Sequence, residues 1–141
     1  MSVELLVILA TTKAPDWSSW NQALWEAHAP ASLSRSVDLQ HHNGYLPVRV
    51  QGRASGFYFL VESATDMALQ YPGLASVPVN KPIVYSLSYG ARPEECAAAF
   101  LSVSVLVSRF EGVVFDPQQG VLLSLEQVND GARQCLNLIP K

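Results

Sequence analysis

Three residues with metal-ligating side chains lie close together in the chain: Asp38, His41 and His42, in the pattern Asp-x-x-His-His. Imidazole nitrogens and carboxylate oxygens are ligands in many zinc sites. Adjacent residues on a strand point to opposite faces, so His41 and His42 bind one ion only where a turn brings them together. Three interpretations stay open: a solvated turn, a turn that contacts a partner, and a metal site that distant carboxylates complete. No other segment is rich in His or Cys, so we predict no metal and no cofactor.

Other acidic and nucleophilic residues give little support for catalysis. Glu94 and Glu95 follow Pro93 and are typical of the first turn of a helix, where the positive end of the helix dipole favours acids. Asp116 ends an apolar segment and precedes a proline, a position at which Asp commonly bonds its own backbone in a turn. The chain contains no Gly-x-Ser-x-Gly segment and no phosphate-binding glycine run. We therefore predict that the protein is not an enzyme.

A basic and aromatic segment interrupts an otherwise mildly acidic chain. No acid occurs between Gln40 and Val61, whereas both His and Arg residues stand there among aromatic residues. Arg and aromatic residues are enriched where proteins contact partners. We predict a partner-binding surface that consists of His41, His42, Tyr45, Arg49, Arg53 and Tyr58, together with Asp116.

The tryptophans point to a further contact surface. Trp17 and Trp20 share one side of an expected helix, which Trp25 only borders. Two interpretations follow: one ring is exposed as a contact residue, or all three pack around a small core. An exposed Trp is typical of the residues that dominate protein interfaces. His28 lies at the end of the same helix, where the dipole favours a cation.

An alternation of strands and helices is predicted to position these residues. Val3 to Ala10 is continuously apolar, which is typical of a central strand buried on both faces. The longest predicted helix begins at Pro93 and carries the apolar stripe Cys96, Phe100, Val103, Val107 and Phe110. Residues 31–36 and 52–56 are expected to be loops. The other expected strands are 37–40, 45–51, 57–63, 83–89, 113–115 and 121–123, and the other expected helices are 15–29, 65–71 and 125–139.

This order predicts a single α+β domain over residues 1–141. We expect a mostly antiparallel sheet of three to six strands, with helices packed mainly on one face. The element order is similar to a ferredoxin-like arrangement, because two β-α-β halves follow each other. Cys96 and Cys135 each lie on an apolar helical stripe, and we expect two reduced, packed thiols.

Composition excludes several classes of protein. The 141 residues are 49% hydrophobic and 15% charged, which fits one globular domain and excludes disorder. The formal net charge of −3 provides no broad attraction for nucleic acid. The apolar run at the N-terminus includes Glu4, is too short to span a bilayer and lacks a basic start. We expect a cytoplasmic protein that binds neither nucleic acid nor membrane.

Two segments resemble small bacterial cytosolic proteins of the toxin-immunity type. The first runs from His42 to Val48 (HNGYLPV) and continues through Gly52 to the Ser-Gly-Phe segment that ends at Phe57. The second is GVVFDPQQG at residues 112–120, followed by Leu-Ser-x-Glu at 123–126. These motifs are structural rather than catalytic. The resemblance implies a non-catalytic antitoxin that binds a cognate toxin domain and occludes its active site.

Two other functions are consistent with the sequence. One is a small-molecule sensor domain, in which the aromatic hairpin and the Trp helix line an apolar pocket. The other is an enzyme that uses Asp38, His41 and His42 with a metal ion. Substituting both histidines distinguishes these functions, because an enzyme would lose its activity entirely whereas a protein interface would lose affinity by degrees.

Overall fold

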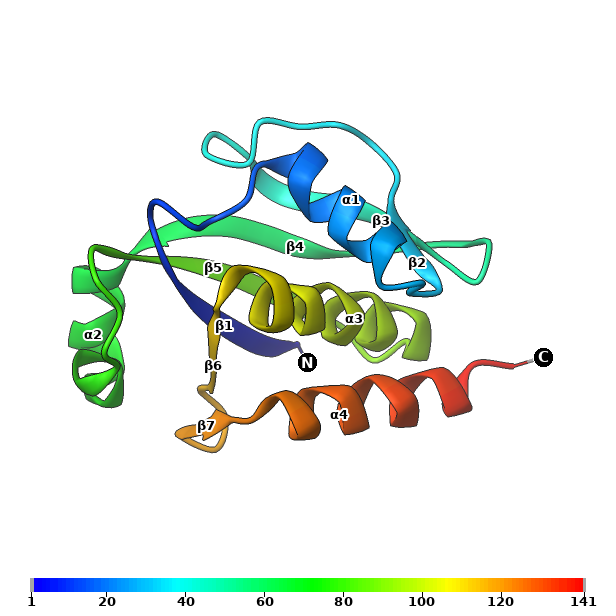
Figure 1. Ribbon diagram of the computed structural model, residues 1–141. Helices are drawn as coiled ribbons and strands as arrows, with labels where there is room; N and C mark the ends of the chain where they lie inside the picture. Colours follow the sequence, from blue (N-terminus) through cyan, green and yellow to red (C-terminus); the bar gives the residue numbers. More distant parts are fainter. Residues whose placement is uncertain (1, 141) are drawn as a thin grey trace.

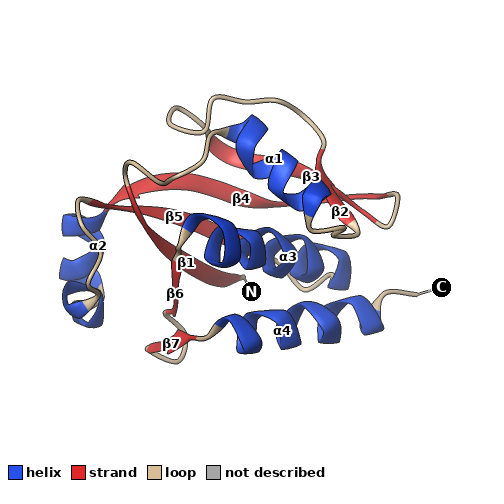
Figure 2. Ribbon diagram, viewed as in Figure 1, coloured by secondary structure: helices blue, strands red, loops and turns tan. Residues whose placement is uncertain are grey.

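The strands of the protein form one antiparallel sheet in the computed structural model, which describes residues 2–140. In chain order the elements are β1 (Val3–Ala10), α1 (Trp17–Glu26), β2 (Ala31–Leu33), β3 (Asn43–Val50), β4 (Arg53–Ser63), α2 (Ala64–Gln70), the 3₁₀ turn η1 (Pro72–Ser76), β5 (Pro82–Tyr89), α3 (Pro93–Phe110), β6 (Val113–Asp116), β7 (Val121–Leu123) and α4 (Leu125–Leu138). In this range, four α-helices accompany a seven-stranded sheet of order β2-β3-β4-β5-β1-β6-β7. The predicted α+β class is confirmed (Figure 1, Figure 2).

The middle of the sheet has a ferredoxin-like order. Strands β6, β1, β5 and β4 are neighbours, α1 follows β1, and α3 connects β5 to β6. This is the order of a β-α-β-β-α-β unit in which the two halves interlock. The sheet continues through β3 and β2 beyond β4, and through β7 beyond β6. The expected element order is therefore present, within a sheet that is larger than the expected three to six strands.

Helices cover the two faces of the sheet unequally. Helices α1, α3 and α4 lie over one face, with α3 between the other two (Figure 1). In the main core beneath them, Trp20 packs against the rings of Phe57, Phe59 and Tyr85 at centroid distances of 5.5 to 6.1 Å. On the opposite face, α2 and η1 cover only one end, over a small cluster that contains Leu6, Ile8, Val84 and Phe115. Most of that face carries no helix.

The segment from residue 31 to residue 56 departs from the expected pattern. Residues 31–33, expected to be a loop, form the edge strand β2 and pair with residues 48–50 of β3. Residues 37–40, expected to be a strand, are irregular and end in a turn. The turn Gln51–Gly52 joins β3 to β4 in place of the expected loop at 52–56. Both turn residues have positive φ, 51° and 79°, as in the type I′ turn that matches the twist of paired strands.

The helix ends follow local capping rules. Asp16 Oδ1 accepts a hydrogen bond from the Ser19 N–H at 2.8 Å and begins α1. A capping box begins α4, because the Ser124 and Gln127 side chains each accept a hydrogen bond from the other residue's backbone N–H. Helix α1 ends at Glu26, three residues before the expected end.

Helix α3 buries a wider face than its predicted stripe. Val103 is fully buried, but Phe100 and Phe110 are only partly buried at the margin of the core. The buried face instead contains a run of small residues, which are Ala97, Ala98 and Ala99. Because successive helix residues are about 100° apart, burial of all three means that α3 is covered on more than one side, by the sheet and by its neighbouring helices.

A disulfide bond joins α3 to α4. It connects Cys96 and Cys135, whose Cα atoms are 5.7 Å apart. The expectation of two reduced thiols is therefore wrong. Each cysteine does lie on an apolar stripe, but the two stripes face each other because α3 and α4 pack side by side (Figure 1).

Candidate functional site

The uncovered part of the sheet carries an exposed pair of tyrosines. Tyr45 of β3 and Tyr58 of β4 lie opposite each other in the register, and their rings pack edge to face at a centroid distance of 5.4 Å. The two side chains remain 40% and 62% exposed. Because both stand on paired strands, the sheet holds them in a fixed arrangement. An amphipathic aromatic pair on a rigid surface is well suited to anchor a protein partner.

A glycine in β4 makes room for this pair. Gly56 has a φ of 152°, and a Cβ atom there would overlap the carbonyl oxygen of Leu46 and lie 2.8 Å from ring carbons of Tyr45. The Tyr45 ring therefore lies against the backbone of Gly56, as aromatic side chains do over glycines in a sheet. Gly56 was expected to be in a loop. It lies inside β4 instead, where its missing side chain leaves space for the Tyr45 ring.

Acidic residues occupy the neighbouring part of the same face. Glu4 of β1 lies near Ser86 of β5, whose hydroxyl donates a hydrogen bond of 3.4 Å to the Glu4 carboxylate. Partial burial raises the pKa of Glu62 on β4, and the charges of Glu4 and Asp66 raise it further. The uncovered face therefore changes from aromatic to acidic between Tyr58 and Glu62.

The two histidines of the Asp-x-x-His-His segment point to different partners. His41 Nδ1 lies 2.7 Å from Asp38 Oδ2, and this hydrogen bond lowers the pKa of the Asp38 carboxyl. His42 Nε2 lies 3.0 Å from the carbonyl oxygen of Tyr45 and 3.2 Å from that of Gly44, so it donates to backbone. The pair does not converge on one position. Among residues 2–140, no group of three or more His, Cys, Asp or Glu side chains is arranged to hold a metal ion.

The remaining expected contact residues lie apart from the tyrosine pair. Arg53 Nη2 donates to the carbonyl oxygen of Pro140, just beyond α4. Asp116 Oδ1 accepts hydrogen bonds from the backbone N–H groups of Gln118 at 2.9 Å and Gln119 at 3.3 Å, which is the turn function expected for this residue. Of the predicted contact residues, the register brings only Tyr45, Tyr58 and Arg49 to the uncovered face, because they alternate with buried residues along β3 and β4.

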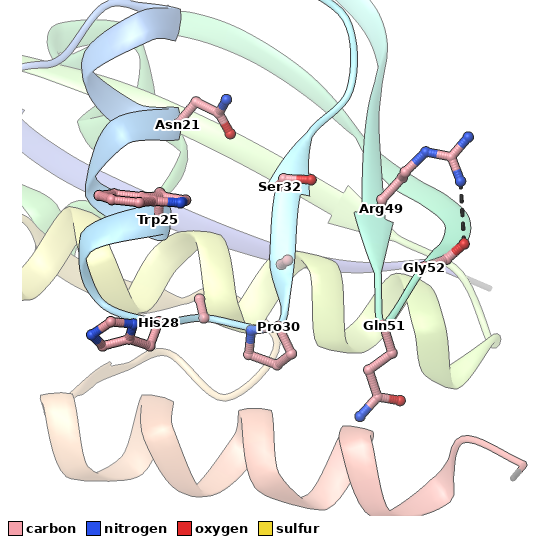
Figure 3. Close-up of a pocket in the computed structure, with 10 residues that line it drawn as sticks. Asn21, Trp25, His28, Pro30, Ser32, Arg49, Gln51 and Gly52 are labelled. Atoms are coloured by element: carbon pink, nitrogen blue, oxygen red, sulfur yellow. Dashed lines mark hydrogen bonds between the residues drawn. The ribbon is translucent and has the colours of Figure 1, made fainter.

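A groove runs along the edge of the sheet at β2. It has a volume of about 550 Å³ and is open to solvent. Figure 3 shows Trp25 on α1 and Arg49 on β3 on either side of β2, with Ser32 between them. Trp25 is 74% exposed, whereas Trp20 is fully buried. Of the two interpretations for the tryptophans, the structure supports the one in which a single ring is exposed, and that ring lines the groove.

The sequence contained signals for Trp25 and Arg49 but none for the part of the groove that β2 forms. Trp25 was recognisable because it lies off the apolar stripe of its helix. The contribution of Ala31 and Ser32 was missed, because a strand of three residues in a serine-rich segment has no periodicity to detect. His28, expected only to cap α1, lies beyond the helix end with a φ of 54° and also lines the groove.

The chain was also compared with known proteins. Family models, curated proteins and solved structures give no match to this sequence or fold. Among the described helices, none has the length and apolar character needed to cross a bilayer. The tyrosine pair and the groove at β2 are therefore the candidate contact surfaces among the described residues.

Proposed function

We propose that the protein is a non-catalytic binding protein of the immunity type, which neutralises a cognate toxin domain by covering its active site. The observation that carries this proposal is the exposed Tyr45–Tyr58 pair on the part of the sheet that no helix covers. Tyrosine and tryptophan dominate the binding energy of protein interfaces, because they bury a large area with few rotatable bonds. The toxin as partner comes from the resemblance in sequence, and the tyrosine face supplies the surface that such a partner needs.

Capture of the partner from the lysate of the native host tests the binding function. We expect the tagged protein to retain one stoichiometric partner, and the Tyr58→Ala variant to bind it about 10-fold more weakly or worse, as loss of an anchor residue does. Leu138→Ala is the matched control, because Leu138 is an exposed apolar residue on α4, over the opposite face. Equal affinity for wild type and Tyr58→Ala would remove the tyrosine pair from the interface.

A growth assay tests the immunity function separately. We expect the captured partner, expressed alone in a bacterial host, to stop growth, and co-expression of this protein to restore it. Tyr58→Ala should restore growth less well than Leu138→Ala. A captured partner that leaves growth unchanged would refute the immunity function while leaving the binding function intact.

The proposal places the protein in the cytoplasm. The redox state of Cys96 and Cys135 tests this location, because it depends on the compartment. The cytosol keeps thiols reduced, whereas disulfides persist in oxidising compartments. The disulfide between α3 and α4 is the observation against a cytoplasmic location. Alkylation of free thiols in intact cells, followed by mass measurement, decides the matter: two alkylated cysteines support the cytoplasm, and none supports an oxidising compartment.

A further inference from the structure

The outer edge of β2 presents backbone groups that no strand pairs. The carbonyl oxygen of Pro30 accepts a hydrogen bond of 2.9 Å from the β3–β4 hairpin, and the Ser34 N–H donates one of 3.0 Å to β3. Since hydrogen-bonded and outward-facing residues alternate in an antiparallel pair, Ala31 and Leu33 direct their backbone groups away from β3. Asn21 Oδ1 accepts from the Leu33 N–H at 2.8 Å, but the hydrogen bonds between described residues leave the N–H and C=O of Ala31 free.

These free groups lie within the groove between Trp25 and Arg49 (Figure 3). Ala31 lines the groove, and unpaired N–H and C=O groups on an edge strand are a template for pairing with another chain. The groove is open to solvent, whereas a site for a small molecule encloses most of its ligand. An open groove beside an unpaired edge strand fits an extended polypeptide, which supplies both a backbone donor and a backbone acceptor.

The charges of the groove indicate the chemistry of this polypeptide. Arg49 lines the groove, and no acid is among its lining residues. Arg49 uses one nitrogen, Nη1, to donate to the carbonyl oxygen of Gly52 at 3.2 Å, so the other donors of its guanidinium remain free for a carboxylate. Glu26, which follows Trp25 on α1, is engaged by Arg109 at 3.2 Å and does not neutralise Arg49.

We propose that the protein partner adds an extended segment to β2 as a further edge strand, with a carboxylate of the segment on Arg49 and an apolar side chain on Trp25. Arg49 belongs to the uncovered face and Trp25 to the helix-covered face. Neighbouring residues of a strand point to opposite faces, so the acidic and apolar residues of the segment are adjacent in its sequence. This inference rests on the proposed function, because the segment belongs to the same partner.

Peptide selection tests the inference without the partner itself. The probe is a phage-displayed library of random 12-residue peptides, selected on the immobilised wild-type protein. We expect the selected peptides to contain an apolar residue next to Asp or Glu, and to bind the Arg49→Gln and Trp25→Ala variants at least 10-fold more weakly. Arg133→Gln is the matched control, since Arg133 is an exposed arginine on α4, and it should bind like wild type.

Two further measurements identify the mode of binding. Replacing the acid of a selected peptide by its amide should weaken binding to wild type at least 10-fold and have no further effect on Arg49→Gln. Hydrogen exchange of the Ala31 N–H should slow when the peptide is bound, because an added strand accepts that hydrogen. A library that yields no binder, peptides that bind Arg49→Gln as well as wild type, or unchanged exchange at Ala31 would each overturn the inference.

The remaining outcomes separate this inference from the proposed function. A dimer of the free protein that Trp25→Ala dissociates would show that a second copy of the chain occupies the edge, and would overturn the inference. If the groove binds no peptide but Tyr58→Ala still impairs capture of the partner, only the inference fails. If peptides bind as expected but no toxic partner is captured, the immunity function fails.

Discussion

One buried tyrosine connects the start of α1 to the centre of the sheet. The Tyr85 hydroxyl on β5 donates to the carbonyl oxygen of Pro15 at 2.7 Å, and its ring packs against Trp20 and Phe59. Burial raises the pKa of Tyr85 from 10.0 to about 12, and the nearby charge of Asp16 adds to the effect. The folded state therefore disfavours the phenolate, and the hydrogen bond depends on the protonated form.

This pKa shift predicts a loss of stability in alkali. The folded pKa is higher than the unfolded value of 10.0, so the contribution of Tyr85 is complete below pH 10 and is lost as the pH rises toward about 12. Tyr85→Phe should cost about 1 kcal/mol at pH 7, because the Pro15 carbonyl loses its donor, and should then lose less stability between pH 9 and 11 than wild type. Urea unfolding across this pH range measures both effects. Parallel pH profiles for the two proteins would show that Tyr85 does not titrate as proposed.

Predictions for single residues were correct where the side chain contacts residues that are close to it in the sequence. The Asp116 turn depends on Gln118 and Gln119, two and three positions away, so the nearby sequence contains the whole interaction. The contact of Arg53 with Pro140 joins residues 87 positions apart, and nothing near Arg53 indicates it. The arrangement of surface residues depends on such contacts between residues distant in sequence. For this reason only some of the predicted contact residues lie together in the structure.

Among the elements, the β3–β4 hairpin shows how composition misleads. The segment Gly52-Arg-Ala-Ser-Gly56 has the residues of a loop, yet only Gly52 lies in the turn. Gly56 is inside a strand because the ring of Tyr45, from the neighbouring strand, occupies the space of its missing side chain. Similarly, β2 is a strand because β3 offers it an edge to pair with. Strand position here is decided by partners distant in sequence.

The disulfide between α3 and α4 predicts a redox-dependent stability. It closes a loop with a sequence separation of 39, for which restriction of the unfolded chain contributes about 4 kcal/mol. Reduction should therefore lower the urea midpoint of unfolding substantially. A variant with Cys96→Ala and Cys135→Ala is the control, because a reductant should leave its midpoint unchanged. An equal midpoint for the wild type with and without reductant would show that the bond is absent in solution.

For the whole molecule, the central part was the most predictable and the edges the least. β1 was recognised because residues 5–9 are buried on both faces, which makes the whole segment apolar. The ferredoxin-like order followed from the alternation of strands and helices around it. The two outer strands, β2 and β7, have three residues each, and only β7 was expected. Sequence patterns weaken toward the edges because burial, which creates them, decreases there.

The decrease in burial from the centre of the sheet to its edges predicts which strands lose their hydrogen bonds first. β5 and β1 have strands on both sides, helices over one face and the α2–η1 cluster over part of the other. β7 pairs with β6 alone and exposes Val121 and Leu122. Backbone amides of β5 and β1 should therefore exchange with solvent only through global unfolding, and those of β7 through local fraying, about a thousandfold faster. Native-state hydrogen exchange by NMR measures this difference. Equal protection of β7 and β5 would indicate that the edge is covered in solution, for example by a second copy of the chain.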